Sequence, residues 1–168
     1  MRLIEKSDLL TEKLADWYTE SAENRVDMGA IEGYELDWVE VKTHLDHYYS
    51  DPTRQLIGAE TDKGNIVGSF FLDDLCPVRK RAFTHVFFTK ESRGKGLVES
   101  YNLCLDYCFI TKGLENLYAH TPEYNKKCVH FVNRFGWVQK GELPGYYLYE
   151  GKPQKALVMC LNKNTRRR

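Results

Sequence analysis

The sequence predicts an α/β (α+β) fold in which strands and helices share one domain. The stretch from Ala82 to Leu97 carries the clearest pattern: eight residues rich in β-branched and aromatic side chains, a short polar turn, and the start of a helical pattern. Along the whole chain, strand-like and helix-like segments follow in the order β-α-α-β-β-β-α-β-α-β-β. With 168 residues, 42% of them hydrophobic and 29% charged, the chain has the length and composition of one folded domain.

The first half of the chain is expected to hold two helices and three strands. Residues 8–21 and 37–49 have apolar side chains at helical spacing, and Asp51-Pro52 ends the second helix. The strands are expected at residues 2–5, 55–60 and 66–72, the last two joined by a hairpin turn at 62–65. Residues 24–35, with two glycines and few apolar side chains, are interpreted as a loop, and residues 73–79 as a polar link to the strand that begins at Ala82.

The second half continues from that strand with helices and strands in turn. A helix is expected at 97–111, with Gly113 after its end, followed by a strand at 114–120 and a helix that closes at Gly136. Strands are then expected at 137–140, 146–149 and 155–161, separated by turns that contain proline and glycine. The domain is expected to span residues 1–161, and the basic tail 162–168 to fray.

The turn Arg93-Gly94-Lys95-Gly96 has features of a phosphate site. It precedes a helix, whose first N–H groups lack intrahelical partners and carry the positive end of the helix dipole. Glycine lets the backbone approach an anion closely. An ordinary connection between strand and helix would show the same residues, and the turn matches neither the Walker A nor the GxGxxG pattern.

The turn resembles the R/Q-x-x-G-x-G/A pyrophosphate loop of the GNAT superfamily of N-acetyltransferases, with Glu91 at the position where the family prefers Arg or Gln. A second signature of that family, N-x-x-A/S-x-x-x-Y-x-x-x-G-F, is echoed about thirty residues later at matching intervals by Asn125, Cys128, Val132, Gly136 and Trp137. The resemblance implies the GNAT fold: a central mixed, mostly antiparallel sheet of about seven strands, splayed in the middle, with about four flanking helices.

The resemblance also implies acetyl-CoA as co-substrate. The pyrophosphate is expected on the turn, and Phe88 is expected to contact the pantetheine or the thioester through its backbone. The resemblance further places Asn125 toward the cofactor, although a helix N-cap is an alternative role for this residue. The residues expected at the cofactor are Phe88, Arg93, Gly94, Lys95, Gly96, Leu97 and Asn125.

Two residues are candidates for proton transfer. His120 lies where the family often places a glutamate base at the end of a strand, and a histidine with a pKa of about 6.5 can serve as a base near neutral pH. A hydrogen-bonded histidine at a strand end is the alternative. Val132 stands where the family usually has a tyrosine acid, so Tyr124, Tyr118 or water is expected to take over that role.

The amine acceptor is expected on an acidic part of the chain. Residues 16–51 contain ten acidic and two basic residues, a net charge of −8, and because the whole chain is neutral the remainder carries +8. Glu32 and Glu35 are candidates for attracting a cation, and Tyr147 in the aromatic segment 146–149 for contacting it through its ring. The alternative is an ordinary solvated surface.

These residues predict an N-acetyltransferase that moves an acetyl group from acetyl-CoA directly to a primary amine: a protein N-terminus, a lysine or a small polyamine-like acceptor. The alternative is a catalytically weak GNAT-fold module that binds coenzyme A or a protein partner. The five cysteines form no CxxC pair and no metal is expected. No membrane segment or secretory signal is visible, so a cytoplasmic location is expected; a homodimer is compatible with the sequence, and nucleic-acid binding is not expected.

Overall fold

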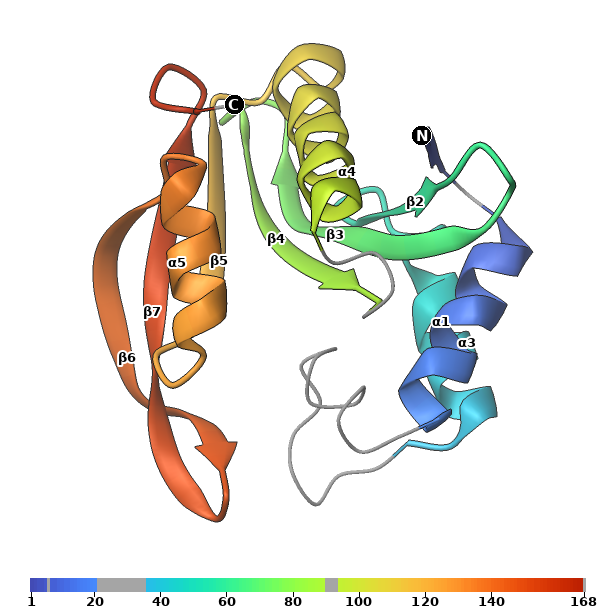
Figure 1. Ribbon diagram of the computed structural model, residues 1–168, viewed down its shortest axis with the longest axis horizontal. Coiled ribbons are helices and arrows are strands. Elements are labelled where there is room, and N and C mark those ends of the chain that lie inside the picture. Colours follow the sequence, from blue (N-terminus) through green and yellow to red (C-terminus); the bar gives the residue numbers. More distant parts are fainter. Residues whose placement is uncertain (6, 21–35, 90–93, 168) are drawn as a thin grey trace.

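The structure is a computed structural model that describes residues 1–5, 7–20, 36–89 and 94–167 (Figure 1). A seven-stranded sheet forms its centre, in the strand order β1-β2-β3-β4-β5-β7-β6. All neighbouring strands in it are antiparallel except β4 and β5, which are parallel. The strands are β1 (Arg2–Ile4), β2 (Gln55–Glu60), β3 (Ile66–Cys76), β4 (Arg81–Phe88), β5 (Asn116–Pro122), β6 (Val138–Tyr149) and β7 (Lys152–Asn162). The prediction of a mixed, mostly antiparallel sheet of about seven strands is confirmed.

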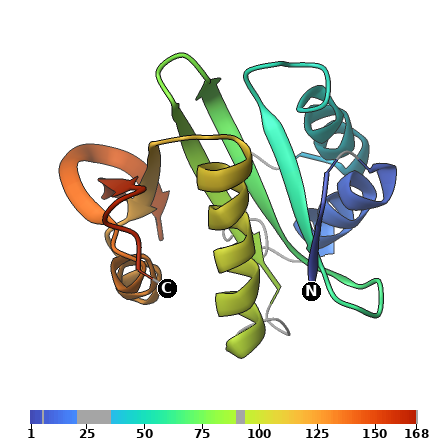
Figure 2. The same cartoon turned by 90° about the horizontal axis from the view of Figure 1, so that it is seen from above.

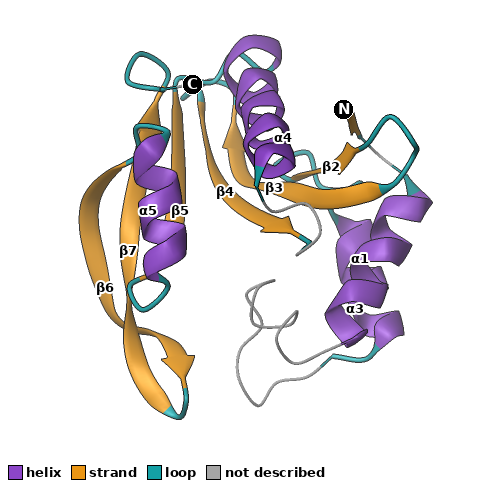
Figure 3. Cartoon of the chain, viewed as in Figure 1, coloured by secondary structure: helices purple, strands orange, loops and turns teal. Residues whose placement is uncertain are grey.

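Helices cover both faces of this sheet (Figures 2 and 3). They are α1 (Asp8–Glu20), α3 (Trp38–His47), α4 (Lys95–Asp106), which continues into the π-helical turn η2 (Tyr107–Thr111), and α5 (Lys126–Arg134). The four α-helices in the described part of the chain agree with the prediction of about four. In the part of the chain that the structure describes, no helix is long and apolar enough to cross a membrane.

Two buried clusters assign the helices to opposite faces. One cluster joins α1 and α3 to the sheet and includes Leu14, Leu45 and Phe71. The other joins α4 and α5 to the sheet and includes Tyr101 and Phe135, whose rings meet edge to face with centroids 4.6 Å apart. Side chains alternate along a strand, so β2, β3 and β4 contribute to both clusters, whereas β5 and β7 contribute to the second one. We refer to these two sides as the α1/α3 face and the α4/α5 face.

Strands β4 and β5 pair over a short distance only. Their register joins Arg81, Ala82 and Phe83 of β4 to residues 116–118 of β5. Beyond these three pairs β4 continues to Phe88 and β5 to Pro122, and the two strands diverge (Figure 1). We call residues 84–88 of β4 and 119–122 of β5 the splay. Its presence confirms the prediction of a sheet that is splayed in the middle.

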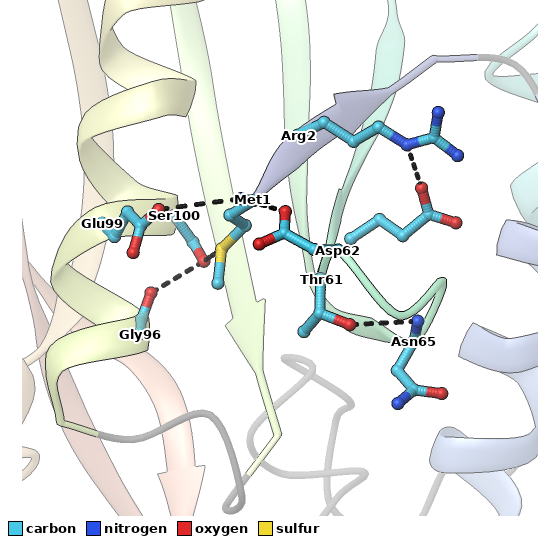
Figure 4. A network of polar contacts seen from close by, with 9 residues as sticks. Met1, Arg2, Thr61, Asp62, Asn65, Gly96, Glu99 and Ser100 are labelled. Carbon is cyan, nitrogen blue, oxygen red and sulfur yellow. Dashed lines mark hydrogen bonds and ion pairs between the residues drawn. The ribbon is translucent and has the colours of Figure 1, made fainter.

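The beginning of the chain lies between the β2–β3 hairpin and α4 (Figure 4). The amino group of Met1 contacts the carboxylates of Asp62 (2.6 Å) and Glu99 (3.7 Å), and the Met1 side chain meets the Ser100 hydroxyl. Next to it, Arg2 pairs with Glu60. These contacts connect the first turns of α4 to the edge of the sheet.

Three strands are longer than the sequence predicts. One of them, β7, begins at Lys152, in residues that were expected to form a turn. β3 continues to Cys76, although residues 73–79 were expected to be a link, because Asp73 still pairs with Phe83 of β4 before the register shifts. β6 runs without interruption over residues 138–149, where two short strands were expected. Its register with β7 shifts between Leu143 and Tyr147, so the Pro-Gly segment forms an irregularity within one strand instead of ending it.

The C-terminal tail does not fray over its described residues. The side chain of Arg166 is 8% exposed, and its guanidinium bonds the carboxylate of Asp106 (2.6 Å) and the carbonyl of Asn102 (3.1 Å) on α4. The N–H of Arg167 donates to the carbonyl of Phe135 (3.0 Å). The tail therefore holds α4 and the end of α5 together, which composition alone did not reveal because a basic tail is usually solvated.

Candidate active site

The edge of β4 that faces β5 lies open along the splay. The N–H of Thr89 donates to the carbonyl of Val67 on β3 (3.0 Å). Backbone polar groups alternate in direction along an antiparallel pair, so those of Val86 and Phe88 point away from β3, toward the side of β5. Within the described residues, pairing of β4 with β5 ends at Phe83. The predicted contact residue Phe88 therefore presents its backbone where an extended ligand can add to the edge of β4.

Gly94 and Gly96 lie at the start of α4. Gly94 is the N-cap. Its backbone has φ 101° and ψ −135°, a conformation that residues other than glycine rarely adopt. Among the described residues, a Cβ atom added to Gly94 would meet nothing within 4 Å, and one added to Gly96 would meet only the Met1 methyl carbon, at 3.9 Å. Both glycines thus border open space at the positive end of a twelve-residue helix, a suitable place for an anion.

The structure describes some of the other residues predicted for the phosphate turn. Lys95 begins α4, and Leu97, in its first turn, is half-buried. Arg93 and Glu91 lie outside the described residues.

His120 lies in the splay on β5 and faces the α1/α3 side. Its Nδ1 is 3.2 Å from the hydroxyl oxygen of Tyr146, and its ring packs against those of Phe83 (5.3 Å between centroids) and Tyr146 (4.9 Å). The backbone carbonyl of His120 accepts a hydrogen bond from the hydroxyl of Tyr147 (3.2 Å). Burial lowers the pKa of His120 below its usual value, because desolvation disfavours the imidazolium. The imidazole is therefore neutral at neutral pH.

Tyr124 belongs to the same group of aromatic residues. Its ring stacks on Tyr149 at 4.2 Å and meets Tyr147 edge to face at 6.4 Å. Burial raises the pKa of Tyr147 well above its usual value, so its hydroxyl stays protonated and donates to His120. The structure thus brings together His120, Tyr124 and Tyr147, three residues that the sequence analysis selected from different segments.

Asn125 caps a helix. Its side-chain oxygen accepts the N–H of Cys128 (3.0 Å) at the start of α5, so the alternative role considered for this residue is present. Val132, on the same helix, is 5% exposed and packs in the core of the α4/α5 face, so no proton donor occupies this position. The predicted acceptor residues Glu32 and Glu35 lie outside the described residues.

The sequence analysis missed two neighbours of His120. Phe83 contacts the His120 ring, and Tyr146 provides the partner of Nδ1. Alternation along β4 places the side chains of Phe83, His85 and Phe87 on one face, a pattern that is visible in the sequence. Which face this is depends on strand pairing, and Tyr146 reaches His120 only because β6 is continuous past the Pro-Gly segment.

Comparison with known proteins agrees with this geometry. The family model described as "Acetyltransferase (GNAT) domain" matches residues 1–157. A spermidine N(1)-acetyltransferase of Vibrio cholerae is 27% identical over 116 residues, which are 68% of this chain and 66%, just under two thirds, of that protein.

Solved structures of spermidine N-acetyltransferase from Vibrio cholerae share the fold. One, in complex with CoA and spermine, superposes with a TM-score of 0.84 at 21% identity and covers 98% of this chain and 96% of that one. Another, described as a dodecameric structure in an intermediate state, gives 0.79 at 21% identity over 97% and 94% of the two chains. The predicted family is confirmed: this chain belongs to the GNAT family of acetyltransferases.

Proposed function

We propose that this enzyme acetylates a primary amine of a small polyamine, with acetyl-CoA as donor. The observation that carries the proposal is the splay, which has the start of α4 near one side and the His120 cluster on the other. The names of the similar proteins, which act on spermidine or hold spermine, support a polyamine as acceptor. The acidic stretch from residue 16 to residue 51 favours a cationic acceptor in the same way.

The cofactor would lie along β4. Its pyrophosphate would take the free amides at Gly94, Lys95, Gly96 and Leu97, with Arg93 nearby, and its pantetheine would pair with the backbone of Phe88. The absence of side chains at Gly94 and Gly96 supports this fit, because the open space there allows close backbone approach. Asn125 is engaged as the cap of α5, so any contact with the cofactor would involve its amide NH₂ group.

The chemistry would be direct transfer. The amine nitrogen attacks the thioester carbonyl carbon, the C–S bond breaks, and the amine loses a proton. With Nδ1–H donating to the Tyr146 oxygen, Nε2 of His120 carries the lone pair that accepts this proton, directly or through water. The coenzyme A thiolate then takes a proton from Tyr124 or from water. Tyr147 would hold His120 in place and contact the acceptor through its ring.

We propose in addition that the protein self-associates. The similar protein described as dodecameric supports this, and so do the exposed apolar side chains of Val138, Leu148 and Tyr149 on the edge strand β6. Light scattering coupled to size-exclusion chromatography tests the proposal. A mass of about 20 kDa at all concentrations would contradict it.

Release of free thiol from acetyl-CoA tests the reaction and the acceptor together. The assay compares spermidine, spermine and a simple diamine with a lysine peptide and with a peptide that has a free N-terminus. We expect release with the polyamines and little with either peptide. Release with a peptide alone would contradict the polyamine assignment, and binding of acetyl-CoA without release by any amine would favour the non-catalytic module.

A further inference from the structure

A second polar site lies on the α1/α3 face, beside the proposed reaction centre. A pocket of about 220 Å³ lies between α1, α3, β3 and β4. Polar side chains from four elements line it: Tyr18 of α1, His44 of α3 with Tyr48 at the C-cap of this helix, Asp73 of β3 and His85 of β4. Aromatic and aliphatic side chains make up the remaining wall, including Phe71. The mechanism proposed above uses none of these residues.

The pocket and His120 open on the same side of the sheet. Phe83 contacts the His120 ring, and His85, two residues further along β4, contacts Phe71 in the cluster under α1 and α3. Alternate residues of a strand point to one face and lie about 7 Å apart. Asp73 of the pocket pairs with Phe83 in the register of β3 and β4, so the pocket and His120 lie on either side of one residue, and an alkyl spacer of a few methylene groups can join amines bound at these two places.

Among the described residues, the charged side chains beside the pocket leave an excess of one carboxylate. Arg54 lies 3.4 Å from Asp73 and 3.6 Å from Asp51, so one guanidinium serves two carboxylates. The Tyr48 hydroxyl also donates to Asp73 (3.2 Å). Burial and the nearby charge of Asp73 raise the pKa of Tyr48 well above its usual value, so the phenol remains a neutral donor. The rings of Tyr48 and Phe71, 5.4 Å apart, add π faces to this acidic site.

We propose that this pocket, which we call the Asp73 pocket, binds the remote ammonium of the acceptor while the reactive amine lies at the splay. The inference rests on the function proposed above and makes it more specific: the preferred acceptors are diamines and longer polyamines with a spacer of a few methylene groups. Asp73 provides the counter-charge, and the rings of Tyr48 and Phe71 receive the cation and its hydrocarbon chain. Monoamines of equal length lack this second contact.

The test compares kcat/KM for α,ω-diamines of increasing length with that for monoamines of the same length. The wild type should prefer one short range of diamine lengths. Asp73→Asn, which still accepts hydrogen bonds, should lower the ratio of diamine to monoamine by about tenfold, since it removes the counter-charge. Arg54→Gln should raise the ratio, because it leaves both carboxylates uncompensated. A misfolded protein cannot give changes of opposite sign in these two variants.

Asp74→Asn is the matched control. Asp74 is the next residue on β3, but it pairs with Arg81 (2.8 Å) and does not line the pocket, so the ratio should stay at the wild-type value. An equal ratio in wild type, Asp73→Asn and Arg54→Gln would overturn the Asp73 pocket even if polyamines are good acceptors. Failure of every amine to release thiol would instead overturn the proposed function.

Discussion

The hydroxyl of Tyr147 donates to the backbone carbonyl of His120 across 3.2 Å, so the edge strand β6 holds the part of β5 that carries the proposed base. Tyr147→Phe should remove this bond and keep the ring. We expect a loss of about 1 kcal/mol in unfolding free energy, measured by denaturant titration. We also expect a fall of a few-fold in kcat with little change in the affinity for acetyl-CoA. A kcat equal to that of the wild type would show that the bond only stabilises the hairpin.

His120→Ala should lower kcat by about 10² to 10⁴, the usual contribution of general-base assistance. Acetyl-CoA affinity, measured by calorimetry, should not change, because His120 lies away from the start of α4. Tyr146→Phe removes the partner of Nδ1 and should cause a smaller loss. Wild-type turnover in His120→Ala would mean that the amine loses its proton to solvent.

The pH dependence follows from the burial of His120. Burial lowers its pKa, so the acidic limb of kcat/KM should lie below pH 6.5 and disappear in His120→Ala. The lowered pKa of His120 also makes the free energy of unfolding depend on pH. The neutral histidine is favoured in the folded state, so its contribution is fully present above about pH 6.5 and is lost as the pH falls toward the folded pKa. An acidic limb that survives in the variant would assign it to another group.

Gly96→Asp should separate cofactor binding from folding. An added side chain meets open space there, and an aspartate in the first turn of a helix is compatible with the helix dipole. The carboxylate would repel a pyrophosphate, so acetyl-CoA affinity should fall at least about tenfold while the melting temperature stays near that of the wild type. Gly141→Asp, on β6 and also in open space, is the control. Unchanged affinity in Gly96→Asp would contradict the placement of the cofactor. Gly94 is less suitable, because its φ of 101° makes any substitution strain the backbone.

Arg166→Gln should destabilise the whole domain. The Arg166 guanidinium bonds Asp106 and Asn102, and losing hydrogen bonds to a charged, partly buried partner should cost about 1.5 to 3 kcal/mol. Arg167→Gln, whose exposed side chain leaves the backbone bond to Phe135 intact, should change little. Equal melting temperatures of Arg166→Gln and the wild type would mean that the tail is dispensable.

Much of the fold could be predicted because its signals are local. The strand at Ala82, the glycine turn and the hairpin at residues 62–65 each appear in a few neighbouring residues. The length of β6 could not be predicted, because Pro144 and Gly145 resemble a turn. Only the pairing with β7 shows that the strand continues. The packing of Arg166 depends likewise on Asp106, sixty residues away in the chain.

The candidate site was likewise predictable where its signals are local and unpredictable where they depend on strand pairing. The family signatures indicated the start of α4, His120 and Asn125. The proximity of Tyr124, Tyr146 and Tyr147 to His120 depends on the register among β5, β7 and β6. No spacing in the sequence encodes that register, which explains why Tyr146 was missed. Phe83 was missed because its contact with His120 depends on the pairing of β4 with β5. The role of each site residue stays a prediction until the variants above are measured.

The three residue pairs between β4 and β5 have a mechanical consequence. They divide the sheet into two blocks, one of β1 to β4 and one of β5, β7 and β6, that are joined by this short pairing, by the contact of α4 with α5 and by the C-terminal tail. A cofactor lying in the splay would contact both blocks. It would act as a non-covalent cross-link where β4 and β5 do not pair. The cohesion of the molecule would then depend on its co-substrate, and at a hundred times the dissociation constant the gain would be about 2.7 kcal/mol. The enzyme would be most easily pulled apart after coenzyme A has left.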